Sequence, residues 1–339
     1  MEDKKETSPD MLLQPWHEMD DYEWNETVIY RIFREETSPD MLLQPWHEMD
    51  DYEWNETSLE RLQTEIEEYT PLAELEGSPE KIPFVNVLLM GRISSGKSSF
   101  FNTVESVIKG RLSIRSRAGC ATSSLTKSLD VYKVKGRRTF RHLRFRMIDC
   151  RGLEEDQSIN SRDVEAILDG HVMDGYVFNQ GTPINKDNSK FRKDPSIGDR
   201  VHCVLFVVDG SNPPEITMSQ NVEKQVKELQ ELMNGRKIPQ LILLTKLDTM
   251  VTVKEDLSKV FHSRSVLEMR DKVAMSFGLP SYTVLPMQNL ANSRTVSTEI
   301  KMLTLYNIRQ ILRAADDYLE NFEDEILADT YMGAQVKTH

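Results

Sequence analysis

Short apolar runs that alternate with helical stretches dominate the chain from residue 84 onwards. The runs occupy residues 84–90, 201–208, 240–244 and 282–286, and each has the length and composition of a buried strand. Between and after them, apolar residues recur at the spacing of a buried helix face. Such faces comprise Val222, Val226, Leu229 and Met233, and then Leu305, Ile308, Leu312, Ala315 and Leu319. Strands that alternate with helices predict an α/β fold with a doubly wound, mostly parallel sheet.

Residues 126–149 predict two further strands. The stretch is divided by Gly136, and in its second half Leu143, Phe145 and Met147 alternate with arginines. Two strands joined by a short turn pair in the antiparallel direction. We therefore expect a hairpin that adds an antiparallel edge to the parallel sheet.

A duplicated segment precedes this pattern. Residues 6–27 (the first copy) and 36–57 (the second copy) carry the same 22-residue sequence at an offset of 30, and both are rich in Asp, Glu and Pro. Two units are too few for a repeat fold, and this composition is typical of chains that do not fold alone. The sequence predicts a disordered acidic arm over residues 1–57. Because all four tryptophans lie in the copies, the arm is either a docking motif or a duplicated linker without a partner.

A short amphipathic helix is predicted after the arm, since Leu59, Leu62 and Ile66 recur at helical spacing before Pro71. Thr57 and Glu60 have the spacing of a capping box at its start. The predicted organisation is the arm over 1–57, a helix and linker over 58–80, the α/β domain over 81–322, and a C-terminal tail over 323–339.

Charge is distributed unevenly. Residues 1–80 hold 24 acidic and 5 basic side chains, a net charge of −19, whereas residues 81–339 hold 31 acidic and 37 basic ones, a net charge of +6. The acidic total of −13 argues against general nucleic-acid binding, which depends on clusters of Lys and Arg. Residues 109–146 carry twelve Lys or Arg and one acid, Asp130. This stretch faces phosphate, an acidic partner or the arm, or is a solvated edge strand.

Residue usage excludes several classes of protein. The three cysteines, Cys120, Cys150 and Cys203, fit neither a disulfide framework nor a zinc site. The N-terminal residues lack the apolar stretch of a signal peptide, and no apolar run approaches the ~20 residues that span a bilayer. We expect a cytoplasmic protein without a membrane span. Four histidines without metal spacing are interpreted as structural, namely His142, His171, His202 and His262.

The most informative motif is GRISSGKS at residues 91–98, hereafter the phosphate loop. It matches the P-loop pattern and lies between a predicted strand and a predicted helix, which is the context that this pattern requires. Backbone N–H groups of such a loop surround a phosphate, the lysine reaches the β- and γ-phosphates, and the following hydroxyl ligates Mg²⁺. The candidate phosphate-binding residues are Gly91, Ser94, Ser95, Gly96, Lys97, Ser98 and Ser99.

Asp149 and Gly152 form a D-x-x-G motif at the end of a predicted strand. P-loop NTPases place there an aspartate of the Mg²⁺ shell and a glycine whose N–H senses the γ-phosphate. The next residue is Leu153, where small GTPases have a glutamine that orients the attacking water. Since leucine has no hydrogen-bonding group, we expect slow hydrolysis. The loop before the hairpin should supply a Mg²⁺-ligating threonine, and the sequence does not choose between Thr122 and Thr126.

Thr245, Lys246 and Asp248 follow the predicted strand at 240–244, at the edge where α/β sheets bind their ligands. A carboxylate at the last position accepts from both the ring N–H and the amine of guanine, and adenine has no such pair of donors. The string therefore favours GTP over ATP, although Thr245 replaces the usual asparagine. After the last predicted strand, Gln288 and Asn289 are candidate contacts to the base.

Six segments carry a resemblance to a known family: GRISSGKSSFFNTV, MIDCRG, DVEAILDGHVMDGYVFN, DRVHCVLFVVDGS, LLTKLD and the closing helix with RAADDYLE. Together they resemble the interferon-induced protein 44 family, over residues 80–325. The resemblance implies a P-loop GTPase-like domain in a cytoplasmic protein of the innate antiviral response. Lys97, Ser98, Asp149 and Asp248 carry over by position. Family members can have a further globular N-terminal domain, whose functions do not carry over because the arm stands in its place.

The sequence thus predicts a guanine-nucleotide-binding protein that uses GTP or GDP with Mg²⁺, with Ser98, Asp149 and either Thr122 or Thr126 as metal ligands. It would act as a switch or slow GTPase that recruits an unknown protein partner. The alternative is a nucleotide-independent adaptor that keeps the fold as a scaffold and docks through the acidic, Trp-containing arm. An ATP-using P-loop protein is the third possibility, against which Asp248 argues.

Overall fold

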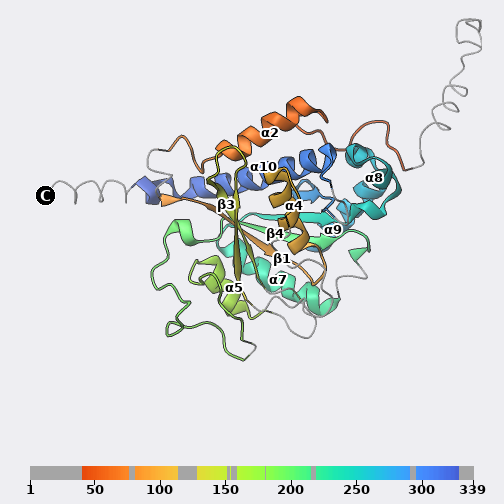
Figure 1. The fold of residues 1–339 in the computed structure, drawn as a ribbon. Helices are drawn as coiled ribbons and strands as arrows, with labels where there is room; N and C mark the ends of the chain where they lie inside the picture. Colours follow the sequence, from red (N-terminus) through yellow and green to blue (C-terminus); the bar gives the residue numbers. More distant parts are fainter. Residues whose placement is uncertain are drawn as a thin grey trace, which may run out of the picture. The chain divides into compact units, whose positions relative to one another are not determined.

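A six-stranded sheet forms the centre of the protein (Figure 1). This computed structural model describes residues 40–75, 81–113, 128–150, 153, 159–179, 181–214, 219–290 and 295–327. The chain divides into two units, Met1–Met41 and Leu42–His339, and all elements named below lie in the second. The strands are β1 (Val85–Met90), β2 (Asp130–Lys135), β3 (His142–Asp149), β4 (Cys203–Asp209), β5 (Gln240–Thr245) and β6 (Val284–Pro286).

The sheet has the order β2-β3-β1-β4-β5-β6. Each neighbouring pair from β3 to β6 is parallel, and β2 pairs with β3 in the antiparallel direction. The predicted doubly wound sheet with an antiparallel edge hairpin is confirmed. Strands β1, β4, β5 and β6 overlap the four apolar runs of the sequence. A strand whose two faces are both covered by helices needs apolar residues at successive positions.

Helices cover both faces of this sheet. On one face lie α4 (Lys97–Lys109) and α10 (Thr298–Leu319), and α2 (Glu56–Glu68) packs on the outer side of α10 (Figure 1). On the other face lie α5 (Ser161–Leu168), α7 (Gln220–Gly235) and α9 (Arg264–Phe277). Short elements complete the body: η2 (Ile197–Asp199), η3 (Leu247–Thr249), α8 (Val251–Glu255), η4 (Leu257–His262), η5 (Ser281–Thr283) and η6 (Glu320–Phe322).

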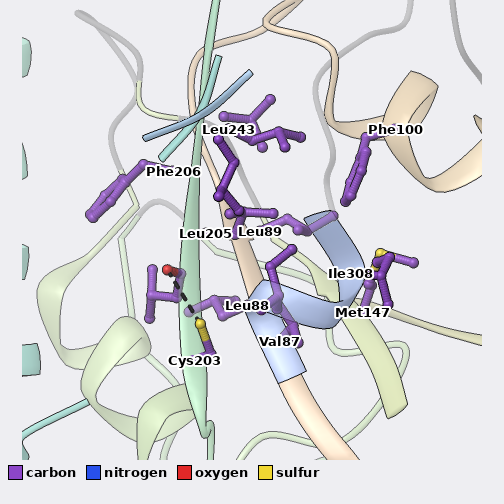
Figure 2. Packing of buried hydrophobic residues seen from close by; sticks show 14 of the residues in the cluster. Val87, Leu88, Leu89, Phe100, Met147, Cys203, Leu205, Phe206, Leu243 and Ile308 are labelled. Atoms are coloured by element: carbon purple, nitrogen blue, oxygen red, sulfur yellow. Dashed lines mark hydrogen bonds between the residues drawn. The ribbon is translucent and has the colours of Figure 1, made fainter. Parts of the chain in front are cut away.

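The core extends from both faces of the central strands. Figure 2 shows Ile308 of α10 close to Met147 of β3, on one side of the sheet. Phe206 of β4 points to the other side, where its ring lies 5.2 Å from that of Phe277 in α9. Two fully buried layers therefore hold the central strands in place, and these strands carry the loops of the candidate site.

The folded body is longer than the sequence predicted. Residues 42–57, assigned above to a disordered arm, belong to the second unit, and Met49 and Tyr52 are buried in its core. The acidic composition wrongly predicted disorder for these residues. Trp46 packs against Phe261, and Asp50 forms ion pairs with two arginines of α10. At the other end the body passes residue 322, since Ile326 is buried. Helix α2 is confirmed, but its N-cap is Asn55, whose side chain accepts from the Ser58 N–H, and not Thr57.

Candidate nucleotide-binding site

The candidate site residues gather at one edge of the sheet. Strands β1, β3, β5 and β6 run parallel, so the segments that follow their C-terminal ends meet at the same edge. Strand β1 lies between β3 and β4, and the strand order therefore reverses beside it. Open α/β sheets bind ligands at such a switch point. The phosphate loop leaves β1 at this point.

Glycine is required at two positions of the phosphate loop. Gly91 has a φ of 154°, and a side chain there would collide with the backbone carbonyl of Val207 in β4. Gly96 has a φ of 107°, and a Cβ would lie 2.9 Å from the Asn289 amide nitrogen. The loop is thus packed tightly against two neighbouring segments and turns directly into α4.

Lys97 is the first residue of α4, and its side chain folds back over the phosphate loop. Its Nζ donates to the carbonyl oxygens of Gly91 at 2.7 Å and Arg92 at 2.9 Å. Although it is charged, the side chain is buried. The loop thus surrounds a fixed ammonium group at the N-terminal end of a helix, where an anion is stabilised.

Asp149 ends β3 and is only 3% exposed. Its Oδ1 has no hydrogen-bond partner among the described residues. Burial raises the pKa of this carboxyl to about 6, and the charge of Lys97 opposes that rise. A buried carboxylate oxygen without a partner is costly, so this position is suited to a cation or a donor from a ligand.

Thr245 holds the phosphate loop in place of the asparagine that is usual there. Its hydroxyl lies 2.6 Å from the carbonyl oxygen of Ser95 and 3.0 Å from that of Val208, and the side chain is fully buried. A second bond comes from Asn289, whose Nδ2 donates to the carbonyl oxygen of Gly96 at 3.2 Å. The sequence predicts Asn289 as a candidate contact to the base, and no signal in the sequence indicated that its side chain also supports the loop.

The segment after β5 presents a charged surface. Lys246 has a left-handed φ of 59°, and its ammonium pairs with the carboxylate of Asp209 at the end of β4. Asp248 lies in η3 and is exposed. In the neighbouring segment, the buried Oε1 of Gln288 has no partner among the described residues. Lys246, Asp248 and Gln288 therefore lie on loops from adjacent strands.

The remaining predicted residues differ in position. Ser94 is exposed with a φ of 63°, Ser95 is buried, and Ser98 and Ser99 are half-buried in the first turn of α4. Gly152, Thr122 and Thr126 lie outside the described residues. Leu153 is buried, and its N–H donates to the carbonyl oxygen of Gly91 at 3.2 Å.

A cavity of about 330 Å³ adjoins the phosphate loop on the side of α7. Its walls include Gly91, Leu153 and Asp209 together with apolar side chains of β4 and α7. Among the described residues, no group of three or more His, Cys, Asp or Glu side chains could hold a metal by itself. Any metal here would need further ligands, as Mg²⁺ does when it is bound through phosphates and one or two side chains.

Comparison with known proteins agrees with this geometry. A family model described as 50S ribosome-binding GTPase matches residues 86–246, which run from β1 past β5. Human interferon-induced protein 44-like is 33% identical over 267 residues, which make up 77% of this chain and 57% of that protein. Mouse interferon-induced protein 44 is 30% identical over 257 residues, 76% of this chain and 59% of that protein.

The chain is a relative of the interferon-induced protein 44 proteins. This resemblance, predicted from six sequence segments, is confirmed. The chain spans less than two thirds of the length of these curated relatives. A crystal structure described as a probable GTP-binding protein, engB, is a loose match, with a TM-score of 0.34 and 16% identity over 68% of this chain and 99% of that one. No helix of the described residues is long and apolar enough to cross a membrane.

Proposed function

We propose that this protein binds a guanine nucleotide with Mg²⁺ at the edge formed by the phosphate loop, Asp149 and the segments after β5 and β6. The β- and γ-phosphates would occupy the loop. Their oxygens would replace the backbone carbonyls of Gly91 and Arg92 as hydrogen-bond acceptors of the Lys97 ammonium group. Ser98 and Asp149 would hold Mg²⁺ together with a threonine of the 114–127 segment. The metal would neutralise phosphate charge.

The observation that carries the proposal is the environment of the Asp149 carboxylate. This group is buried at the end of β3, where burial raises its pKa and the nearby charge of Lys97 lowers it. One carboxylate oxygen has no hydrogen-bond partner among the described residues. A structural aspartate in such a place would normally accept several hydrogen bonds. A bound divalent cation supplies the missing interaction and favours the ionised carboxylate.

Base preference is the first test. Isothermal titration with GTP, GDP and ATP in the presence of Mg²⁺ should give guanine nucleotides an advantage of about tenfold to a hundredfold, the value of one net hydrogen bond to a charged group. Asp248→Asn should move this preference toward xanthine nucleotides. Asp194→Asn, at another exposed position, is the matched control. Equal affinities for GTP and ATP would refute guanine recognition by Asp248.

Slow hydrolysis is the second part of the proposal. Leu153 is buried and has no polar side-chain group, so it cannot orient the attacking water. Single-turnover assays with radiolabelled GTP should show hydrolysis that stays slow at all protein concentrations unless a partner is added. Fast turnover by dilute protein would mean that a different group positions the water.

We also propose that the protein acts in the interferon response, in the cytoplasm and against viruses. Support comes from the relatives, whose names describe them as interferon-induced. Transcript and protein levels should rise in interferon-treated cells, and fractionation should recover the protein with cytosolic markers. An adaptor independent of nucleotide would keep its cellular activity after Lys97→Ala, whereas a nucleotide switch would lose it.

A further inference from the structure

Residues 42–57 of the second copy pack against the surface of the folded body. The surface is formed by η4, α9 and α10, and we name it the docking groove, defined by the residues Phe261, His262, Arg270, Tyr306, Arg309 and Arg313. Backbone bonds set the position of the segment. The Leu42 N–H donates to the carbonyl oxygen of His262 at 2.7 Å, and the Trp46 N–H donates to that of Phe261 at 2.9 Å.

Aromatic side chains anchor the segment. Trp46 meets Phe261 edge to face at 5.1 Å, and the Arg270 guanidinium lies 4.7 Å from the centre of the Trp46 ring. The His47 Nε2 lies 2.8 Å from the Tyr306 hydroxyl, within hydrogen-bonding distance. These contacts give the segment an apolar, well-oriented anchor on the surface of the body.

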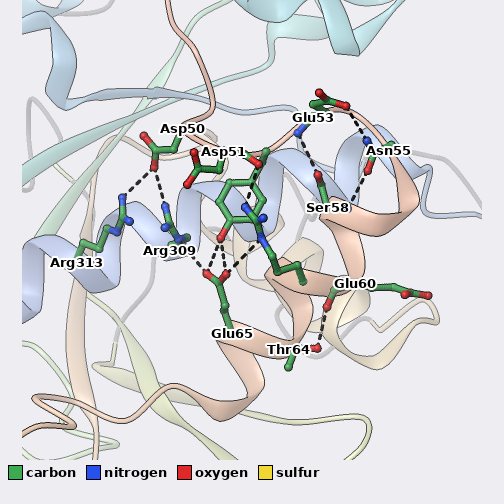
Figure 3. Close-up of polar contacts among 12 residues, drawn as sticks. Asp50, Asp51, Glu53, Asn55, Ser58, Glu60, Thr64, Glu65, Arg309 and Arg313 are labelled. Atoms are coloured by element: carbon green, nitrogen blue, oxygen red, sulfur yellow. Dashed lines mark hydrogen bonds and ion pairs between the residues drawn. The ribbon is translucent and has the colours of Figure 1, made fainter.

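Charge complementarity fixes the next turn of the segment. The Asp50 carboxylate accepts from Arg309 at 2.8 Å and from Arg313 at 2.9 Å, as Figure 3 shows. Burial alone would raise the pKa of Asp50, but the two arginines outweigh it and lower this pKa. Arg309 also pairs with Glu65 of α2 at 3.1 Å. One arginine of α10 therefore contacts both the segment and the helix that follows it.

Every one of these contacts on the segment side is duplicated in the sequence. At an offset of 30, the first copy carries Leu12, Trp16, His17, Met19, Asp20, Tyr22 and Asn25. The correspondence continues beyond the identical 22 residues into the first turns of α2. There Ile29, Arg31, Ile32 and Glu35 correspond to Leu59, Arg61, Leu62 and Glu65. The docking groove, in contrast, is encoded once.

We propose that the docking groove is a binding site for the 30-residue unit, and that residues 6–35 of the same chain are its second ligand, able to replace residues 36–65. The exchange preserves the aromatic anchors and the arginine pairs described above. It releases the second copy and the first turns of α2 from the body.

Loop closure decides which copy is bound most of the time. When residues 36–65 occupy the groove, the chain continues directly into the rest of α2. When residues 6–35 occupy it, 30 residues must be looped out, which disfavours this state by about 30 to the power 3/2, roughly 160-fold. The first copy would thus be bound in about 0.6% of molecules, and it would dominate once binding of the second copy is weakened by more than about 160-fold.

A double-mutant cycle tests the exchange in the full chain. Trp16→Ala with Asp20→Ala should leave the stability unchanged while the second copy is intact. Trp46→Ala with Asp50→Ala should lower the equilibrium constant between the occupied and the empty docking groove by no more than about 160-fold, because the first copy then binds in place of the second. Combining all four substitutions should cost at least a further tenfold. The proposal would be overturned if the variant with all four substitutions were no less stable than the variant with Trp46→Ala and Asp50→Ala alone.

Tryptophan fluorescence gives a direct readout, since all four tryptophans lie in the two copies. In the triple variant Trp46→Ala, Asp50→Ala, Trp54→Phe, the remaining tryptophans lie in the first copy. The mirror variant Trp16→Ala, Asp20→Ala, Trp24→Phe keeps only those of the second copy. Trp16 in the first variant should be as well protected from acrylamide quenching as Trp46 is in the mirror variant. Full quenching as in a free peptide would refute the exchange. Protection that increases with protein concentration and accompanies dimers would show docking to a second molecule and would also overturn it. Neither readout depends on nucleotide binding.

Discussion

His202 should make the protein sensitive to acid. The side chain is fully buried at the start of β4. Its Nδ1 accepts from the Asn86 N–H at 3.0 Å, and its Nε2 donates to the carbonyl oxygen of Ile197 at 2.8 Å. Protonation would place a second N–H against the Asn86 donor. Burial, together with the nearby positive charges of Arg146 and Arg200, lowers the pKa of His202 to about 4.

The size of the effect follows from this pKa. The unfolded chain binds the proton with a pKa near 6.5 and the folded protein with a pKa of about 4. Because the unfolded state binds protons more tightly, the contribution of His202 to stability is complete above pH 6.5 and is lost as the pH falls towards 4. The full difference is about 3 kcal/mol, and about 2 kcal/mol of it is lost between pH 7 and pH 5.

Urea unfolding of wild type and His202→Asn between pH 7.5 and pH 5 measures this contribution. The asparagine oxygen keeps an acceptor for the Asn86 N–H, so the variant should fold, although less stably at pH 7. The readout is the difference between the two pH profiles, because burial raises the pKa of Asp149 and of Asp316 to about 6 and these carboxyls change stability in the opposite direction. His142→Asn, at an exposed histidine, is the control. Parallel profiles for wild type and His202→Asn would refute the reasoning.

Three further predictions concern the phosphate loop and the buried thiols. Gly91→Ala should lower the free energy of unfolding by about 2–4 kcal/mol because its Cβ meets backbone of β4, whereas Gly235→Ala, where nothing lies within 4 Å, should be neutral or stabilising. Thr245→Val should cost about 1–3 kcal/mol in urea unfolding and weaken nucleotide binding, because a buried carbonyl of the loop loses its donor. Burial raises the pKa of Cys150 and Cys203 to about 12, so peptide mass spectrometry should find both thiols labelled about a thousandfold more slowly in native than in unfolded protein at pH 8.

The parallel sheet could be predicted from sequence because its signal is local and repeated. The central strands are buried on both faces, so their sequences are apolar runs, interrupted in β1 by Asn86. Helix α7 buries the four residues that the helical spacing indicated. The hairpin was equally visible, since β3 alternates buried apolar residues with arginines. These patterns depend on neighbours within one element, and a single sequence contains that information.

The second copy could not be predicted in the same way. Its composition is that of a disordered chain, and its stability comes from groups about 200 to 260 residues away, such as Phe261 and Arg309. Composition measures what a segment can bury by itself, whereas docking depends on a groove formed by other elements. The N-cap shows the same limit on a smaller scale, because Asn55 and Thr57 are both acceptable caps and the backbone geometry selects Asn55.

The support of the phosphate loop explains how the site tolerates its departure from the usual motif. An asparagine carries two amide hydrogens, whereas the threonine that stands at this position has a single hydroxyl hydrogen. Thr245 can therefore supply one bond to the loop, and it makes that bond to Ser95. The adjacent carbonyl, that of Gly96, is bound by Asn289, which follows β6. Because Asn289 is next to Gln288, a hydrogen bond joins the candidate phosphate loop to the segment of the candidate base contacts.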